Sequence, residues 1–304
     1  MLFFGEIDLY KKMINIWKSS VPFRVVFGIV LALLSIISVC VGGWFLLVMS
    51  LFLISIGANE YKQFMLNVGF APFFYIITFI SFLILVVTIY KSIYLMPLVI
   101  FVGVFLSFLA ILVSKRKPYI ANITTTILGF LICWLPCHLI LLSQLDDDVY
   151  NISGKEINSG IVYILILFLA VAATDFAAYA VGSRFGKKKL LEEISPNKTV
   201  LGSVSGAFCA VIVTVFAGHS VGLNVANSVL LGFLITIFAQ IGDLSLSVLK
   251  REANLKHSGN LFLKYGGILD RLDSFMFSAP MVYYYFKYNH LFDFYSLIQK
   301  VINF

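Results

Sequence analysis

Charged side chains are scarce in this sequence. They make up 12% of the 304 residues, whereas hydrophobic residues make up 61% and the mean hydropathy is +0.99. A soluble globular domain carries roughly 25% charged residues, so a chain of this composition cannot cover a water-facing surface. The apolar residues also form runs long enough to cross a bilayer, which takes about 20 residues as a helix. The sequence therefore predicts a polytopic integral membrane protein.

Cysteine is also scarce, and the four cysteines are scattered through apolar runs. Cys133 and Cys137, followed by His138, have a spacing that fits no common zinc pattern and lie within an unbroken apolar stretch. We interpret them as parts of helix walls, which leaves the redox compartment open. We expect no cleavable signal peptide, because residues 1–20 mix charged side chains with short apolar pieces.

The hydropathy pattern predicts an all-α fold of about nine transmembrane helices. They cover roughly residues 25–41, 43–57, 71–90, 93–113, 119–143, 159–182, 203–217, 223–249 and 273–287. Cytoplasmic loops of membrane proteins are enriched in Lys and Arg. With a cytoplasmic N-terminus and alternating spans, the cytoplasmic segments hold 18 of the 22 Lys and Arg. This bias supports both the number of spans and their direction.

The two halves of the chain differ in polarity. The first five predicted spans are rich in Leu, Ile, Phe and Val, whereas carboxylates, glycines and basic residues recur in clusters from Ala173 onward. We therefore predict a transmembrane scaffold over residues 1–143 and a catalytic transmembrane half over residues 144–304.

The first polar cluster contains Asp175, Tyr179 and Gly182, whose spacing of three and four residues places them on one helical face. A carboxylate within a membrane helix is costly unless it meets a partner or a polar cavity, so Asp175 is a candidate functional residue. The alternative is a structural hydrogen-bond acceptor between helices.

The second cluster is the polar segment Ser195–Thr199 and the small-residue helix start that follows it, with Lys198 and Ser203. Free backbone N–H groups, hydroxyls and a lysine together suit phosphate binding. The alternative is an ordinary loop followed by close helix packing through small residues.

The third and fourth clusters follow each other closely. Asp243, Ser247 and Lys250 share a helical face. Gly266 and Gly267 then permit close backbone approach, and Asp270 and Asp273 can share one side of a helix start. Carboxylates hold hard cations such as Mg²⁺, and Lys and Arg neutralise phosphate charge, so the set suits a divalent metal that bridges a polyphosphate. A network of structural ion pairs is the alternative.

Read in order, these residues resemble the integral-membrane phosphatidate cytidylyltransferase family, the CDP-diacylglycerol synthases. The resemblance covers about residues 170–280. The segments that carry it are Thr174 to Lys187, Ser195-Pro196-Asn197-Lys198-Thr199, Ser247-Val-Leu-Lys250-Arg251, Lys256, Gly266-Gly267 and Asp270-Arg271-Leu-Asp273. Residues Arg24 to Gly28 and Glu60 also look like features of the family.

Some positions depart from the pattern of the family. Leu201 stands where the family usually has Glu, His257 replaces an Asp, and Leu263, Lys264 and Tyr265 replace a Pro-x-His sequence. The departures leave the carboxylates and cations of the core in place.

The resemblance implies a Mg²⁺-dependent reaction of phosphatidate with CTP that gives CDP-diacylglycerol and pyrophosphate for phospholipid biosynthesis. It implies catalytic roles for Asp243, Asp270, Lys250 and Arg271, with Asp243 and Asp270 as metal ligands. The residues implied in substrate binding are Asp175, Tyr179, Lys198, Ser203, Ser247, Arg251, Lys256 and Asp273. The resemblance leaves open whether a second metal ion binds.

We expect the partners to be CTP, phosphatidate, membrane lipids and a second copy in a homodimer, with no nucleic acid. We expect the protein in the bacterial inner membrane, with its active site on the cytoplasmic side. Two other functions are considered: a divergent relative that uses another lipid phosphate or nucleotide or has lost catalysis, and a transporter. A transporter would place its polar residues at the membrane midplane and repeat them in both halves.

Overall fold

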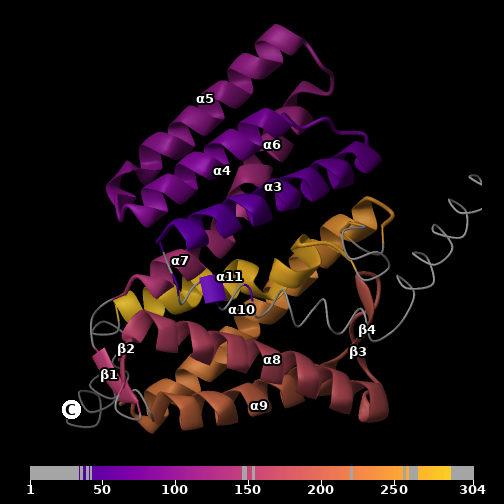
Figure 1. Cartoon of the computed structure of the whole chain (residues 1–304). Helices are drawn as coiled ribbons and strands as arrows, with labels where there is room; N and C mark the ends of the chain where they lie inside the picture. Colours follow the sequence, from indigo (N-terminus) through magenta and orange to yellow (C-terminus); the bar gives the residue numbers. More distant parts are fainter. Residues whose placement is uncertain are drawn as a thin grey trace, which may run out of the picture.

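The structure is a computed structural model. It describes residues 34, 37–38, 41, 43–145, 149–152, 155–219, 222–255, 258–259 and 266–288. Helices dominate these residues and form two groups, drawn one above the other in Figure 1.

The first group contains the helices between residues 43 and 143. They are α3 (Gly43–Val68), α4 (Phe74–Ile89), the 3-10 turn η1 (Ile93–Leu95), α5 (Met96–Ser114), α6 (Tyr119–Trp134), the 3-10 turn η2 (Leu135–Cys137) and α7 (His138–Ser143). Tyr61, Phe64 and Phe130 are completely buried in its core. Cys133 and Cys137 are buried among these helices, in agreement with the interpretation as helix walls.

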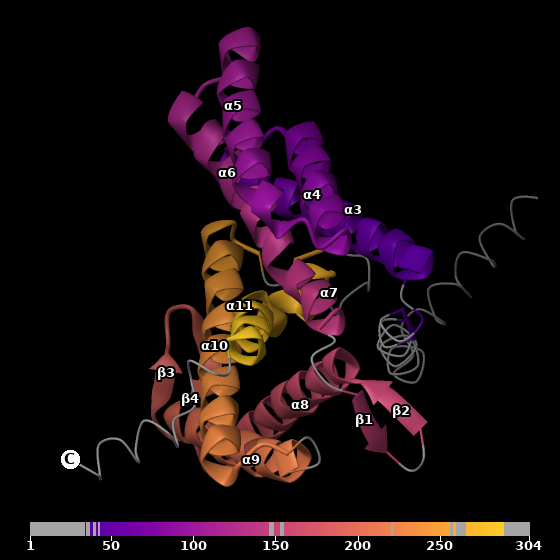
Figure 2. The ribbon, with the colours of Figure 1, turned by 90° about the vertical axis from the view of Figure 1, so that its left-hand side faces the viewer.

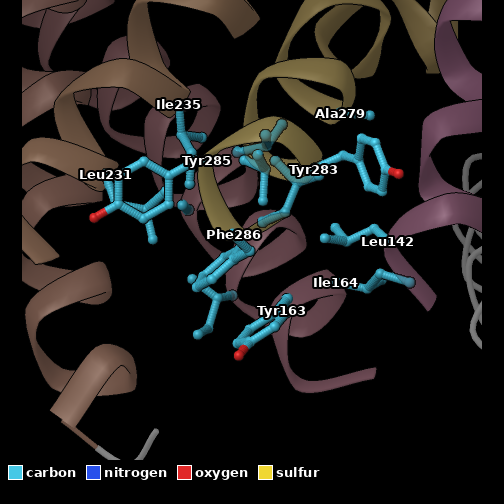
Figure 3. Packing of buried hydrophobic residues seen from close by; sticks show 14 of the residues in the cluster. Leu142, Tyr163, Ile164, Leu231, Ile235, Ala279, Tyr283, Tyr285 and Phe286 are labelled. Carbon is cyan, nitrogen blue, oxygen red and sulfur yellow. The ribbon is translucent and has the colours of Figure 1, made fainter. Parts of the chain in front are cut away.

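The second group contains α8 (Ser159–Phe185), α9 (Val200–His219), α10 (Val225–Glu252) and α11 (Leu269–Lys287). Figure 3 shows its core, where the Tyr163 ring of α8 stacks on the Phe286 ring of α11 with centroids 3.6 Å apart. Leu231 and Ile235 of α10 complete the same cluster. Helix α11 lies between the two groups in both Figure 1 and Figure 2, so it joins them.

Small residues bring the helices of the second group into close contact. A Cβ added at Gly206 of α9 would lie 2.9 Å from the Thr174 carbonyl oxygen of α8. Gly242 of α10 packs in the same way against the Asp273 carbonyl oxygen of α11. Membrane helices commonly pack through such residues, since lipid provides no hydrophobic force that would drive larger side chains together.

Two short antiparallel hairpins lie at opposite ends of α8 (Figure 1), and the all-α prediction missed both. One pairs β1 (Val149–Ile152) with β2 (Lys155–Asn158), and the other pairs β3 (Lys189–Leu191) with β4 (Ser195–Thr199). The strands are three to five residues long and are too short to show a clear alternation of apolar and polar residues. The segment predicted as a loop before a helix is thus strand β4, which runs directly into α9 at Val200.

Five helical segments of the described chain are long and apolar enough to cross a membrane. They are Ile93–Ser114, Tyr119–Ser143, Ser159–Phe185, Val200–His219 and Val225–Glu252, and Phe74–Ile89 is a shorter apolar helix. They support the assignment to the membrane. The predicted span 25–41 lies largely outside the described residues, and the count of nine spans stays a prediction.

The helix ends alternate between two sides of the molecule. Lys91, after α4, donates to the Gln144 carbonyl oxygen after α7 at 3.0 Å, so α4 and α7 end on the same side. Toward the other side, Glu60 in the C-terminal half of α3 contacts the backbone at the start of α11. A chain that crosses a bilayer back and forth would place the ends of its helices on two sides in this way.

Candidate active site

The predicted site residues gather at one end of the second group of helices. There α8 ends, β4 leads into α9, α10 ends and α11 begins. In Figure 1 this end lies on the right, and in Figure 2 the β3–β4 hairpin lies beside α10. Segments that are 20 to 100 positions apart in the chain therefore meet within one region.

Asp243 on α10 contacts two other residues that the sequence assigned to the site. Its Oδ2 forms an ion pair with Lys198 Nζ of β4, and its Oδ1 accepts from Ser247 Oγ at 3.4 Å. The side chains of Lys198 and Asp243 are 29% and 26% exposed, so water-soluble groups can reach them. The prediction that Asp243 and Ser247 share a helical face is confirmed by this contact.

Asp270, in the first turn of α11, is more enclosed. Lys250 Nζ donates to its Oδ1 at 2.6 Å, while the Ser258 and Gly267 N–H groups donate to its Oδ2 at 2.7 Å and 3.2 Å. Burial by itself would raise the pKa of Asp270, but the Lys250 ammonium and the Ser258 N–H favour the ionised form and hold the pKa below its ordinary value. Asp270 is therefore a carboxylate at neutral pH.

Asp175 and Asp273 complete a set of carboxylates from three helices. Asp243 interacts electrostatically with Asp175 of α8 and with Asp273 of α11. Asp273 also interacts with Lys250 and Asp270. The four carboxylates that the sequence singled out thus interact with one another, and Lys198 and Lys250 each form an ion pair with one of them.

The remaining predicted residues differ in their surroundings. Ser203 Oγ donates to Gln240 Oε1, which ties α9 to α10. Arg251 Nε donates to the Ile194 carbonyl oxygen at 3.0 Å and so joins α10 to the β3–β4 turn. Tyr179 is 76% exposed, and Arg271 is exposed in the first turn of α11. Lys256 lies outside the described residues.

Glu60 contacts this site, although no role there was predicted for it from the sequence. Its side chain is 6% exposed and accepts from the Ile268 N–H at 2.9 Å, the Leu269 N–H at 3.0 Å and Ser258 Oγ at 3.1 Å. The available signals were its resemblance to a feature of the family and its place at the end of an apolar run. The partner could not be inferred, because it lies about 200 positions further along the chain.

The donor set matches a hard cation such as Mg²⁺, since all four side chains offer carboxylate oxygens. Within the described ranges, no three His, Cys, Asp or Glu side chains lie close enough to form a metal cage by themselves. Mg²⁺ is usually held by one or two carboxylates together with substrate phosphates and water. Asp243 and Asp270 therefore fit a metal ion that is shared with a polyphosphate.

Comparison with known proteins shows which family this chain resembles. The sequence pattern of the Cytidylyltransferase family matches residues 22–289. The phosphatidate cytidylyltransferase of Synechocystis is 32% identical over 282 residues, which cover 86% of this chain and 93% of the relative. Those of Staphylococcus aureus (strain COL) and Staphylococcus saprophyticus are 44% and 45% identical over 127 residues, or 41% of this chain. The chain spans about half the length of these staphylococcal relatives, 49% in each case.

Proposed function

Since the chain belongs to the Cytidylyltransferase family, we propose that it makes CDP-diacylglycerol from phosphatidate and CTP. The observation that carries the proposal is the convergence of four carboxylates and two lysines, from α8, β4, α10 and α11, at one end of a membrane protein. Relatives at 32% to 45% identity bear the name phosphatidate cytidylyltransferase.

The reaction exchanges one phosphoanhydride bond for another. A phosphate oxygen of phosphatidate attacks the α-phosphorus of CTP, the bond from that phosphorus to the bridging oxygen breaks, and pyrophosphate leaves with the electron pair. A bound Mg²⁺ would neutralise the phosphate charge that opposes this attack. Such a reaction depends chiefly on positioning and on charge neutralisation.

The protein groups have separate tasks in this proposal. Asp243 and Asp270 would hold the metal ion, and Asp175 and Asp273 would support them. A lysine already stands beside each proposed ligand, Lys198 at Asp243 and Lys250 at Asp270. In the complex, each carboxylate would face the metal while its lysine faces a phosphate oxygen.

Further cations would bind the other phosphates of CTP or phosphatidate. Arg251, Lys256 and Arg271 take this role in the proposal, and Ser203 and Ser247 would donate hydrogen bonds to phosphate oxygens. Tyr179 would contact the substrate near Asp175. Residues 1–143 would serve as a scaffold for the catalytic half, residues 144–304, and homodimerisation stays a prediction.

A direct assay tests the proposed reaction. Purified protein with CTP labelled at the α-phosphate should transfer label to phosphatidate in the presence of Mg²⁺, with release of unlabelled pyrophosphate. The assay should include other lipid phosphates and the other nucleoside triphosphates. If transfer occurs only to another lipid phosphate or only from another nucleotide, the protein is a divergent relative with a different substrate. If no combination of lipid phosphate and nucleotide gives transfer, the catalytic proposal is rejected.

One described departure from the family pattern motivates the wider panel. Leu201, where the family usually has Glu, is the second residue of α9 and its side chain is 45% exposed. It follows the β4 strand that carries Lys198. The departures at His257, Leu263, Lys264 and Tyr265 lie outside the described residues.

We also propose that this end of the molecule faces the cytoplasm of a bacterial inner membrane. Lys187 to Lys189, Lys198, Lys250 and Arg251 lie at this end, and basic residues favour the cytoplasmic side. CTP is a charged, water-soluble nucleotide that is synthesised and used inside the cell, so a cytoplasmic site would have access to it.

Cysteine labelling in intact cells tests this orientation. Asn197 is exposed on β4, and Tyr94 is 79% exposed at the opposite ends of the helices. In a background without the native cysteines, we expect a membrane-impermeant maleimide to label Tyr94→Cys but not Asn197→Cys. Permeabilised cells should give labelling of both variants. Labelling of Asn197→Cys alone in intact cells would reverse the orientation.

A further inference from the structure

Glu60 is a buried carboxylate whose hydrogen-bond partners, among the described residues, belong to the start of α11 and the segment before it. Its side chain, on α3, accepts from two backbone N–H groups, those of Ile268 and Leu269, and from the Ser258 hydroxyl. A carboxylate in an apolar interior is unfavourable unless such donors surround it. These three donors show that the Glu60 side chain binds the start of α11 and Ser258.

The contact replaces a missing helix cap. The first N–H groups of an α-helix have no partner within the helix, and the side chain of the residue before the first turn commonly accepts from one of them. Ile268 stands at that position in α11 and has no side-chain cap hydrogen bond. Glu60 caps the helix from α3 instead, and its negative charge also suits the positive end of the helix dipole.

Ser258 extends the contact from Glu60 to Asp270. The Ser258 hydroxyl donates to Glu60 and accepts from the Asp270 N–H at 3.2 Å and the Gly267 N–H at 3.0 Å. The Ser258 N–H donates to Asp270 Oδ2 at 2.7 Å. Both the backbone and the side chain of Asp270 are thus held by a residue that Glu60 holds.

Two glycines make room for the Glu60 carboxylate. A Cβ added at Gly259 would lie 2.7 Å from Glu60 Oε1, and one added at Gly267 would overlap both carboxylate oxygens. The sequence predicted close backbone approach at Gly266 and Gly267. The structure shows that at Gly267 the approaching group is the side chain of Glu60.

Apolar contacts join the same elements without Glu60. Leu246, Leu269 and Met276 from α10 and α11 are buried in one cluster with Ala58, Tyr61 and Phe64 of α3. Apolar contacts are not directional, whereas hydrogen bonds from Glu60 set the position of particular backbone atoms. A carboxylate at this position is therefore suited to set the geometry of the α11 start more than to hold the helices together.

We propose that Glu60 is a positioning residue for the reaction: it holds the start of α11 so that the Asp270 carboxylate keeps its place beside Lys250, where it would bind the metal ion. This inference rests on the proposed function, and it adds a residue from the first group of helices to a site otherwise built from the second. Glu60 acts through Ser258 and the α11 backbone and touches no reacting atom.

Three variants test the proposal by activity. Glu60→Ala removes all three hydrogen bonds, whereas Glu60→Gln keeps the volume and one acceptor oxygen but turns an N–H group toward a backbone donor. We expect kcat per folded molecule to fall in the order parent, Gln, Ala, with a loss of about 10- to 100-fold for Glu60→Ala, as for residues that orient metal ligands. Ser258→Ala should also lower kcat, and the KM for phosphatidate should change little.

A neighbouring residue provides the matched control. The Tyr61 hydroxyl donates to the Thr125 carbonyl oxygen of α6 at 2.7 Å, and the ring is completely buried. Tyr61→Phe therefore removes a buried hydrogen bond from the same helix without touching the α11 start. We expect this variant to lose some thermal stability and to keep the kcat of the parent.

Hydrogen exchange gives a second readout that does not depend on catalysis. The amides of residues 267–270 should exchange faster in Glu60→Gln and Glu60→Ala than in the parent, and at the parental rate in Tyr61→Phe. If the parent transfers no nucleotide, the proposed function fails, and the exchange rates still test the contact. Parental kcat and parental exchange in Glu60→Gln and Ser258→Ala would overturn the inference. It would also be overturned if these variants gave less folded protein but kept the parental kcat per folded molecule.

Discussion

Replacing Asp270 by Asn should abolish nucleotidyl transfer while the protein stays folded in the membrane. The amide keeps the volume of the carboxylate, and its oxygen can still accept from the Ser258 or Gly267 N–H. Its N–H₂ group cannot bind a metal and would face the Lys250 ammonium or a backbone donor. We expect kcat to fall by more than about 100-fold, since even a partner of a metal ligand typically contributes 10- to 100-fold.

A charge-matched control separates this effect from the loss of any carboxylate at this end of the molecule. Glu252 is exposed at the end of α10, two residues after Lys250. Glu252→Gln removes the same charge and should keep parental activity. Both variants should be compared at saturating Mg²⁺ after gel filtration and a thermal melt in detergent. If Asp270→Asn and Glu252→Gln have equal activity, Asp270 is not a metal ligand.

Adding one methyl group at Gly242 should disrupt the contact between α10 and α11. In a free helix, Gly→Ala is favourable by about 0.5–1 kcal/mol. Here the new Cβ would overlap the Asp273 carbonyl oxygen, a backbone atom that cannot rotate away. Overpacking of this kind costs about 1–3 kcal/mol or more, so the unfavourable effect should dominate and lower the free energy of unfolding.

The activity of Gly242→Ala should fall as well. Gly242 precedes Asp243, and the displaced backbone belongs to Asp273, so the methyl group would shift two of the four carboxylates. A misplacement of about 1 Å can reduce a rate about 100-fold. The matched control is Gly57→Ala on α3, where the added Cβ would lie 3.5 Å from Leu269 Cδ2, an ordinary contact. We expect Gly57→Ala to keep parental activity and to be as stable as the parent or slightly more stable, because no clash opposes the gain in helix propensity. Equal melting temperatures and rates for both variants would contradict the close packing at Gly242.

Local sequence patterns predicted the class of protein and most of its helices. Every predicted span from residue 43 onward overlaps an observed helix, because apolar runs of this length are recognisable without knowledge of their neighbours. The predicted boundaries differ from the observed ones: α3 continues to Val68 beyond the predicted 43–57, and α11 begins at Leu269 instead of residue 273. Polar residues at both helix ends lower the hydropathy there, although they remain helical.

The candidate site was predictable residue by residue but not as an arrangement. Asp175, Asp243, Asp270 and Asp273 stand out in an apolar chain because ionised groups are costly there. Their pairing with Lys198 and Lys250 depends on how three helices and a strand approach one another. No spacing in the sequence distinguishes the lysine that will face a given carboxylate.

The sequence by itself determined that this protein enters a membrane and that clusters of carboxylates and basic residues recur in the C-terminal half, since hydropathy and side-chain type are local properties. Only the tertiary structure decided that Glu60, 208 positions before Ile268, caps the helix that carries Asp270. It also decided that Ser195–Thr199 pairs as a strand. Hydrogen bonds act over about 3 Å and depend on direction, so their partners are defined only once the folded backbone has brought distant segments together.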